Sequence, residues 1–174
     1  MTVQRLLSAS QMKTLLIVFH SMTGGTEQMA QAAFRGACTQ AGVNVRLLRA
    51  RDAAASDVLE ADAYVFATPE NLAAIAGQMK DFFDRSYYGA LDQIGGRAYG
   101  LLVCAGSDGQ NAVRQVERIC TGWRLKRVVE PLIVCTHAQT PEAILAPKHI
   151  GAADLERCEA IGTGIAAGLA LGIY

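Results

Sequence analysis

Hydroxyl and glycine residues gather in one short segment that follows the first apolar run of the chain. Ser21, Thr23 and Thr26 offer hydroxyl donors. Gly24 and Gly25 let the backbone turn so that several amide N–H groups point into one space. A helix that begins there adds the partial positive charge of its N-terminus. Because the segment contains no lysine or arginine, we expect it to bind one phosphate group through neutral donors, unless it is a plain connection in which Thr26 caps the helix.

Two later loops also follow apolar runs and carry groups that suit ligand binding. The first is Thr68–Leu72, in which Pro69 fixes the backbone and the next three residues offer amide groups to the edge of a ligand. The second is Gly106–Gly109, a tight polar turn in which Ser107 and Asp108 stand between two glycines. We expect this turn to bind a ligand, or to use Asp108 as the cap of the helix that follows.

Apolar runs and helical patterns alternate along the chain and define the elements that carry these loops. Short apolar runs predict strands at residues 14–19, 43–48, 63–67, 98–104 and 132–136. Apolar residues at helical spacing predict helices at residues 26–41, 72–85, 109–124 and 153–171, with a short helix within 52–59. This alternation predicts an α/β fold in which helices cover both faces of a parallel sheet. Ligands of such sheets bind beyond the carboxyl ends of the strands, where all three loops lie.

The first loop, Ser21-Met22-Thr23-Gly24-Gly25-Thr26, resembles the FMN phosphate loop of the flavodoxin family, whose pattern is Ser/Thr-x-Thr-Gly-x-Thr after the first strand. Residues 68–84 are similar to the flavin loop and following helix of NAD(P)H-dependent FMN reductases and related quinone reductases. The resemblance spans residues 13–172 and implies a flavodoxin-like three-layer sandwich with a five-stranded parallel sheet of order 2-1-3-4-5. It also implies that FMN is held by Ser21, Met22, Thr23, Gly24, Gly25, Thr26, Pro69, Glu70, Asn71, Leu72, Gly106, Ser107, Asp108 and Gly109.

Other chemistries that use similar residues lack a necessary part. A Walker A loop needs a lysine that the first loop lacks, and the dinucleotide glycine fingerprint does not follow the first strand. The glycines at 162–168 lie within the last predicted helix and are expected to allow close helix packing. Ser21, His137 and Asp108 have the residue types of a hydrolase triad, but the chain has no Gly-x-Ser-x-Gly elbow. His20 and His137 adjoin the ligand loops, in a structural or a ligand-contacting role, and no catalytic residue is identified.

Composition sets the broad class of protein. The chain has 174 residues, which suits one domain, and its 16 basic and 16 acidic residues give no net charge and no indication of a nucleic-acid partner. Its five cysteines are widely spaced, which favours neither a disulfide framework nor a metal site. We find no secretory signal and no apolar run of the ~20 residues that span a membrane, and therefore expect a cytoplasmic protein. Residues 1–12 are expected to form a flexible extension before an FMN-binding domain at 13–174.

The same features favour an enzyme over an electron carrier. Carrier flavodoxins tend to be strongly acidic and to cover the flavin with aromatic side chains, whereas this chain is neutral and residues 68–73 and 105–110 contain no aromatic residue. An open ring face would admit NAD(P)H and a small acceptor such as a quinone. We therefore predict an NAD(P)H-dependent FMN oxidoreductase that forms a homodimer or larger homo-oligomer. A carrier and a non-catalytic binding module remain as alternatives, and the choice between NADH and NADPH stays open.

Overall fold

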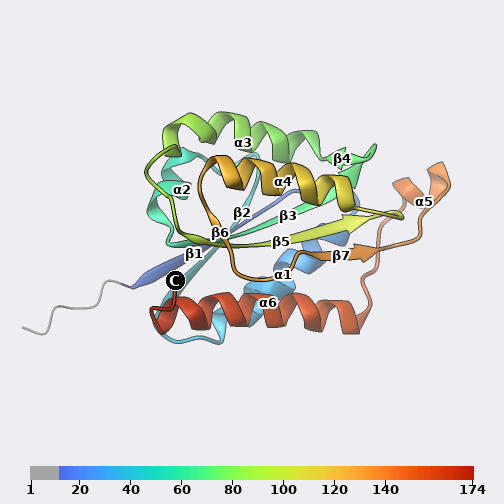
Figure 1. Ribbon diagram of the computed structural model, residues 1–174. Coiled ribbons are helices and arrows are strands. Elements are labelled where there is room, and N and C mark those ends of the chain that lie inside the picture. The colour runs from blue at the N-terminus through green and yellow to red at the C-terminus, as the bar shows by residue number, and fades with distance from the viewer. Residues whose placement is uncertain (1–11) are drawn as a thin grey trace, which may run out of the picture.

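The computed structural model of the protein describes residues 12–174, and its centre is a seven-stranded, mostly parallel sheet (Figure 1). Its strands are β1 (Lys13–Phe19), β2 (Val43–Arg49), β3 (Ala63–Asn71), β4 (Ala74–Ile75), β5 (Ala98–Ala105), β6 (Lys126–Arg127) and β7 (Leu132–Cys135). The main order is β2-β1-β3-β5-β6, with β7 also pairing with β5 and β4 pairing antiparallel with β3. The predicted order 2-1-3-4-5 is confirmed, with β6 and β7 sharing the fifth position.

Helices cover both faces of the sheet, as the alternating pattern predicts (Figure 1). One face carries α1 (Gly25–Cys38) and α6 (Ala152–Ala170), and the other carries α2 (Ala55–Glu60), α3 (Gly77–Ala90) and α4 (Gln110–Gly122). The short helix α5 (Pro141–Leu145) stands apart from both layers, beyond the carboxyl end of β7. Among the described residues, no helix is both long and apolar enough to cross a membrane.

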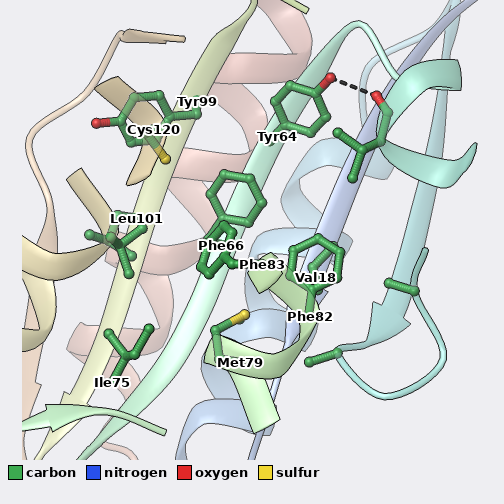
Figure 2. Packing of buried hydrophobic residues seen from close by; sticks show 14 of the residues in the cluster. Val18, Tyr64, Phe66, Ile75, Met79, Phe82, Phe83, Tyr99, Leu101 and Cys120 are labelled. Atoms are coloured by element: carbon green, nitrogen blue, oxygen red, sulfur yellow. Dashed lines mark hydrogen bonds between the residues drawn. The ribbon is translucent and has the colours of Figure 1, made fainter. Parts of the chain in front are cut away.

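The two faces of the sheet bury separate cores because successive side chains of a strand point in opposite directions. In β1, Leu16 and Val18 join the core under α2, α3 and α4, whereas Leu15 and Ile17 join the core under α1 and α6. The first core is centred on Phe66, whose ring lies 5.7 Å from that of Tyr64 and is surrounded by other aromatic rings (Figure 2). This rigid core fixes the strands whose ends carry the candidate site.

Glycines allow α1 and α6 to pack closely. A side chain at Gly162 would overlap the backbone carbonyl of Ala33, and one at Gly36 would overlap the carbonyl of Glu159. Close packing is therefore confirmed as the role of Gly162 in the 162–168 series. Gly164, in contrast, faces open space.

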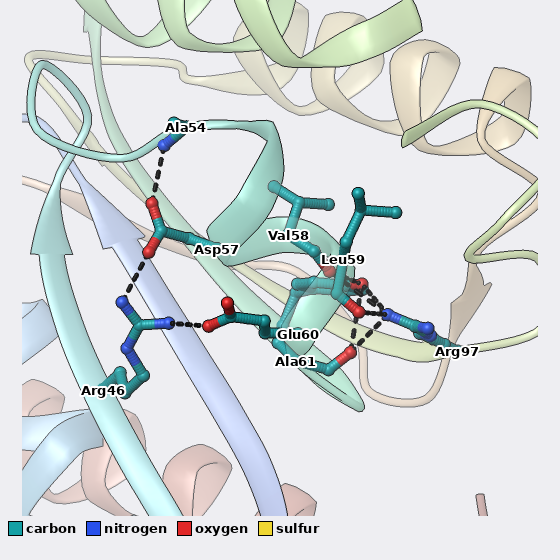
Figure 3. Close-up of polar contacts among 9 residues, drawn as sticks. Arg46, Ala54, Asp57, Val58, Leu59, Glu60, Ala61 and Arg97 are labelled. Carbon is teal, nitrogen blue, oxygen red and sulfur yellow. Dashed lines mark hydrogen bonds and ion pairs between the residues drawn. The ribbon is translucent and has the colours of Figure 1, made fainter. Parts of the chain in front are cut away.

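Two arginines hold the six-residue helix α2, which is too short to be stable by itself (Figure 3). Arg46 forms ion pairs with Asp57 and with Glu60. Arg97 donates from one guanidinium nitrogen to the carbonyls of Val58, Leu59 and Ala61 at the end of the helix. These contacts satisfy carbonyl groups that a helix end leaves without an internal partner.

The structure corrects several predicted boundaries, above all between residues 68 and 77. The helix expected at 72–85 begins only at Gly77, because β3 continues to Asn71 and turns back as β4. Leu72, expected on the buried helix face, is instead fully exposed at the tip of the turn. The two-residue strands β4 and β6 and the five-residue helix α5 are not predicted by the sequence pattern. Of the predicted N-terminal extension, residues 1–11 lie outside the described residues.

Candidate functional site

A cavity of about 560 Å³ opens at the carboxyl ends of the strands and brings together loops that are far apart in the sequence. It is lined from the three predicted loops by Ser21, Met22, Thr23, Gly25, Thr26, Pro69, Glu70, Asn71, Leu72, Gly106 and Ser107. The remaining predicted site residues, Gly24, Asp108 and Gly109, do not line the cavity. Its position agrees with the rule that parallel sheets bind ligands at this edge.

The first loop places the start of α1 against the cavity. Gly24 is the N-cap residue and adopts a φ of 88°, in the left-handed region that favours glycine. Its N–H donates to the Ser21 hydroxyl at 3.1 Å, which closes the loop. No side chain caps α1, so the first amide groups of the helix have no side-chain acceptor. The alternative in which Thr26 caps the helix is wrong, because Thr26 lies one residue inside it.

Gly25 marks a close approach between this loop and two other segments. A side chain there would lie 2.8 Å from Cys104 Sγ and 3.2 Å from Lys148 Cβ. Thr26, next in sequence, is buried to 1% exposure yet borders the cavity. The start of α1 is therefore packed tightly against both segments.

The second loop is a two-residue hairpin that joins β3 to β4. Leu72 and Ala73 occupy its centre with φ values of 50° and 59°, a turn geometry that normally calls for Asn-Gly. Left-handed conformations at residues other than glycine are strained, and such strain concentrates at functional sites. The Leu72 side chain is fully exposed at the turn and lines the cavity.

Helix α4 and its N-cap residue hold this hairpin in position through three hydrogen bonds. Asn111 Nδ2 donates to the Ala73 carbonyl at 2.6 Å, and Gln115 Oε1 accepts from Ile75 N at 2.8 Å. Glu70 Oε2 accepts from the Gly109 N–H at 2.9 Å. The second and third loops are therefore fixed to one another, although almost forty residues separate them along the chain.

The third loop contributes fewer residues to the cavity lining than the sequence predicts. Gly106 and Ser107 line the cavity, whereas Asp108 does not. The alternative role of Asp108 as the helix cap is wrong, because Gly109 is the N-cap of α4 and no side chain caps it. Gly109 adopts a φ of 80°, which explains the glycine at that position.

A fourth segment completes the cavity and supplies residues that are not predicted from the sequence. The chain after β7 contributes Thr136, Ala138, Gln139, Ile144 and Lys148. The sequence does show polar residues after the fifth predicted strand, at the edge of the sheet where the other loops lie. They form no recognisable motif, so the sequence does not indicate that they line the cavity. This segment includes α5, which lies beyond the carboxyl end of β7 (Figure 1), and we call it the outer wall of the cavity.

Gln28 and Lys148 join this outer wall to the first loop. Gln28 Nε2 donates to the carbonyls of Gly24 and Lys148, and its Oε1 accepts from Ile150 N. Lys148 N donates to the Thr23 carbonyl at 2.8 Å. The Lys148 ammonium donates to three carbonyls at the end of α5. A basic residue thus lies close to the first loop, but its ammonium group already binds carbonyls at the end of a helix.

The ionisable groups around the cavity favour binding over covalent chemistry. Burial raises the pKa of the Cys104 thiol to about 11, despite a hydrogen bond with Thr26 that lowers it, so this cysteine is a poor nucleophile at neutral pH. Burial, together with the nearby charge of Arg49, lowers the pKa of His20, which is therefore neutral at pH 7. His137 is exposed with a φ of 57° and does not line the cavity.

The lining suits a ligand that joins a phosphate to a flat, largely apolar ring. Hydroxyl and amide donors collect at the start of α1, and Met22, Leu72 and Ile144 supply exposed aliphatic surface around the opening. The size of the cavity is typical of small-molecule sites. These features fit FMN with its phosphate on the first loop.

Comparison with known proteins agrees with this fit. The sequence profile described as Flavodoxin matches residues 17–147, about three quarters of the chain. This chain belongs to the flavodoxin family. FMN is the cofactor of the family, so the predicted cofactor is confirmed.

Individual relatives carry two different names. A flavodoxin from Aquifex aeolicus is 33% identical over 94 residues, covering 54% of this chain and 49% of the relative. An NAD(P)H dehydrogenase (quinone) from Acidithiobacillus ferrooxidans is 30% identical over 95 residues, covering 43% of this chain and 48% of the relative. The chain thus spans about half the length of the curated relatives it matches. A solved archaeal flavodoxin has a TM-score of 0.72 at 17% identity, covering 90% of this chain and 98% of that one, which shows the shared fold.

Proposed function

We propose that this flavodoxin-family protein is an oxidoreductase that passes electrons from NAD(P)H through bound FMN to a small acceptor such as a quinone. The observation that carries the proposal is the absence of aromatic side chains from the flavin cavity: among residues 12–174, none of its lining residues is aromatic. A ring held there has no aromatic cover, so a nicotinamide or quinone has access to it. The similarity to a protein named NAD(P)H dehydrogenase (quinone) supports the same function.

Each loop has a distinct role in this proposal. The amides at the start of α1 and the hydroxyls of Ser21, Thr23 and Thr26 hold the phosphate of FMN. The hairpin at residues 70–73 and the turn at 106–107 border the flavin ring, with Leu72 as its aliphatic contact. The bound flavin supplies the redox chemistry, while the protein orients it and controls which molecules reach it. Anchoring the hairpin to α4 keeps the ring edge in a fixed position.

Reduction under nitrogen tests the proposal. The protein loaded with FMN is mixed with NADPH or NADH, and the visible absorbance of the flavin is followed before and after a quinone is added. We expect the nucleotide to bleach the flavin and the quinone to restore its colour. An electron carrier, the function named for the Aquifex aeolicus relative, is the second candidate. A flavin that is bleached by dithionite but not by either nucleotide would overturn the reductase proposal in its favour.

A single substitution tests whether the lack of aromatic cover on the flavin ring allows its reduction by NAD(P)H. Leu72 is fully exposed, so Leu72→Trp adds an aromatic side chain beside the ring without disturbing a core. We expect this variant to bind FMN at least as tightly and to be reduced by NADPH about tenfold more slowly or worse, a loss that corresponds to roughly 1.4 kcal/mol. Leu171→Trp, at a leucine that is 74% exposed and far from the cavity lining, serves as the control.

A further inference from the structure

A second cavity lies across the β3–β4 hairpin from the flavin cavity. It has a volume of about 540 Å³ and is formed by β4, the first turn of α3 and one side of α4. Leu72 and Ala73 line the flavin cavity, whereas the next two residues, Ala74 and Ile75, line the second one. One hairpin therefore separates the two cavities, and a ligand long enough to cross it would reach both.

The second cavity combines an apolar surface with a rim of cations. Ala74, Ile75 and Ile119 provide the apolar surface. Lys80 comes from α3, and Arg114 and Arg118 come from successive turns of α4. Within residues 12–174, no aspartate or glutamate is among its lining residues. This composition suits a ligand with a flat apolar group and an attached anion.

The positive charge of this rim is only partly balanced. Lys80 forms an ion pair with Asp84. Arg114 and Arg118 are exposed and form no ion pair within the described part of the chain. Their spacing of four residues places two like charges side by side on the helix, where they repel each other. Arg114 Nε donates to the Gln110 carbonyl at 3.4 Å, which leaves its two terminal nitrogens available. The rim therefore has two guanidinium groups that can bind an anion.

The floor of the cavity is held rigidly. Gln115, which lies between the two arginines in sequence, accepts a hydrogen bond from Ile75 N and so fixes β4 against α4. The carbonyl of Ala73 is fixed by Asn111 of the same helix. The cationic rim thus has a constant position relative to the hairpin that borders the flavin cavity.

We propose that the second cavity binds the adenosine 2′-phosphate of NADPH. Adenine packs on the apolar surface, and Arg114 and Arg118 bind the 2′-phosphate, whose charge of about −2 matches the two unpaired guanidinium groups. Arginine forms paired hydrogen bonds to phosphate, which suits this contact. The nicotinamide end crosses the hairpin into the flavin cavity. This inference rests on the proposed function and adds to it a preference for NADPH over NADH.

Binding of adenosine 2′,5′-bisphosphate tests this site without any redox step. Calorimetric titration of the FMN-loaded protein should show binding that is at least about tenfold tighter than that of 5′-AMP or inorganic phosphate. Arg114→Gln/Arg118→Gln should abolish that advantage. Arg51→Gln/Arg157→Gln removes the same total charge from exposed arginines outside the cavity and should leave it unchanged.

Kinetics supply the second readout. We expect Arg114→Gln/Arg118→Gln to raise KM for NADPH about tenfold, with kcat and the KM for NADH unchanged. Equal binding of the bisphosphate to wild type and double variant, or equal binding of 5′-AMP and the bisphosphate, would overturn the site even if NADPH reduces the flavin. Arginine-dependent binding of the bisphosphate by a protein whose flavin NADPH cannot reduce would support the site and reject the reductase proposal.

Discussion

Leu72 and Ala73 hold the central positions of a turn for which their side chains are poorly suited. Replacing them with the favoured pair, Leu72→Asn with Ala73→Gly, should raise the free energy of unfolding of the apoprotein by about 1 to 2 kcal/mol, because left-handed strain is relieved. Chemical denaturation measures this change. Because the leucine side chain is lost, FMN affinity should fall in the same variant. Unchanged stability would show that the turn is not strained.

His20 should make stability depend on mildly acidic pH. Burial lowers its pKa in the folded state below the usual value of 6.5, so the unfolded chain takes up the proton first. The folded state therefore loses stability as the pH falls below about 6.5 and until the folded-state pKa is passed, whereas above 6.5 the histidine is neutral in both states and has no effect. His20→Gln should flatten the curve of unfolding free energy against pH in this range. If the curves of unfolding free energy against pH were parallel for the variant and the wild type, His20 would not be the cause of the pH dependence.

At the level of the helices, a substitution at Gly162 tests the contact between α1 and α6. Gly162→Ala places a methyl group against the carbonyl of Ala33 and should destabilise the protein by about 1 to 3 kcal/mol. Gly164→Ala, two residues along the same helix and facing open space, should instead stabilise it by about 0.5 to 1 kcal/mol. Thermal or chemical unfolding of the pair measures the difference. Similar effects of the two substitutions would contradict the packing described here.

The sequence predicts those elements whose burial leaves a clear pattern. β1 and β5 are buried along almost their whole length and therefore appear as continuous apolar runs. β6 and α5 have no buried residues, so their positions depend on partners that the local sequence does not reveal. The sequence pattern predicts a helix from residue 72 because Leu72, Ile75 and Met79 are apolar at helical spacing, although Leu72 is exposed and Ile75 belongs to a strand.

The candidate site was predictable to the extent that each loop has its own motif. The loops after β1, β3 and β5 have recognisable glycine, hydroxyl or proline patterns, and they do meet at one cavity. Lys148 and Gln139 enter the same cavity from a segment without a motif. The cationic rim of the second cavity was missed because Lys80 and Arg114 lie on different helices and become neighbours only through the fold.

For the molecule as a whole, the central proposal is that FMN binds through its phosphate at the loop Ser21–Thr26. Riboflavin is the same flavin without the phosphate, so the ratio of the two dissociation constants measures this contribution directly. Hydrogen bonds to a charged group contribute about 1.5 to 3 kcal/mol each, so at least two of them should make FMN bind about a hundredfold more tightly or better. The measurement is a titration of the apoprotein that follows the quenching of flavin fluorescence. A ratio of at least a hundred is the predicted result, and equal affinity for FMN and riboflavin would show that this loop does not bind the phosphate.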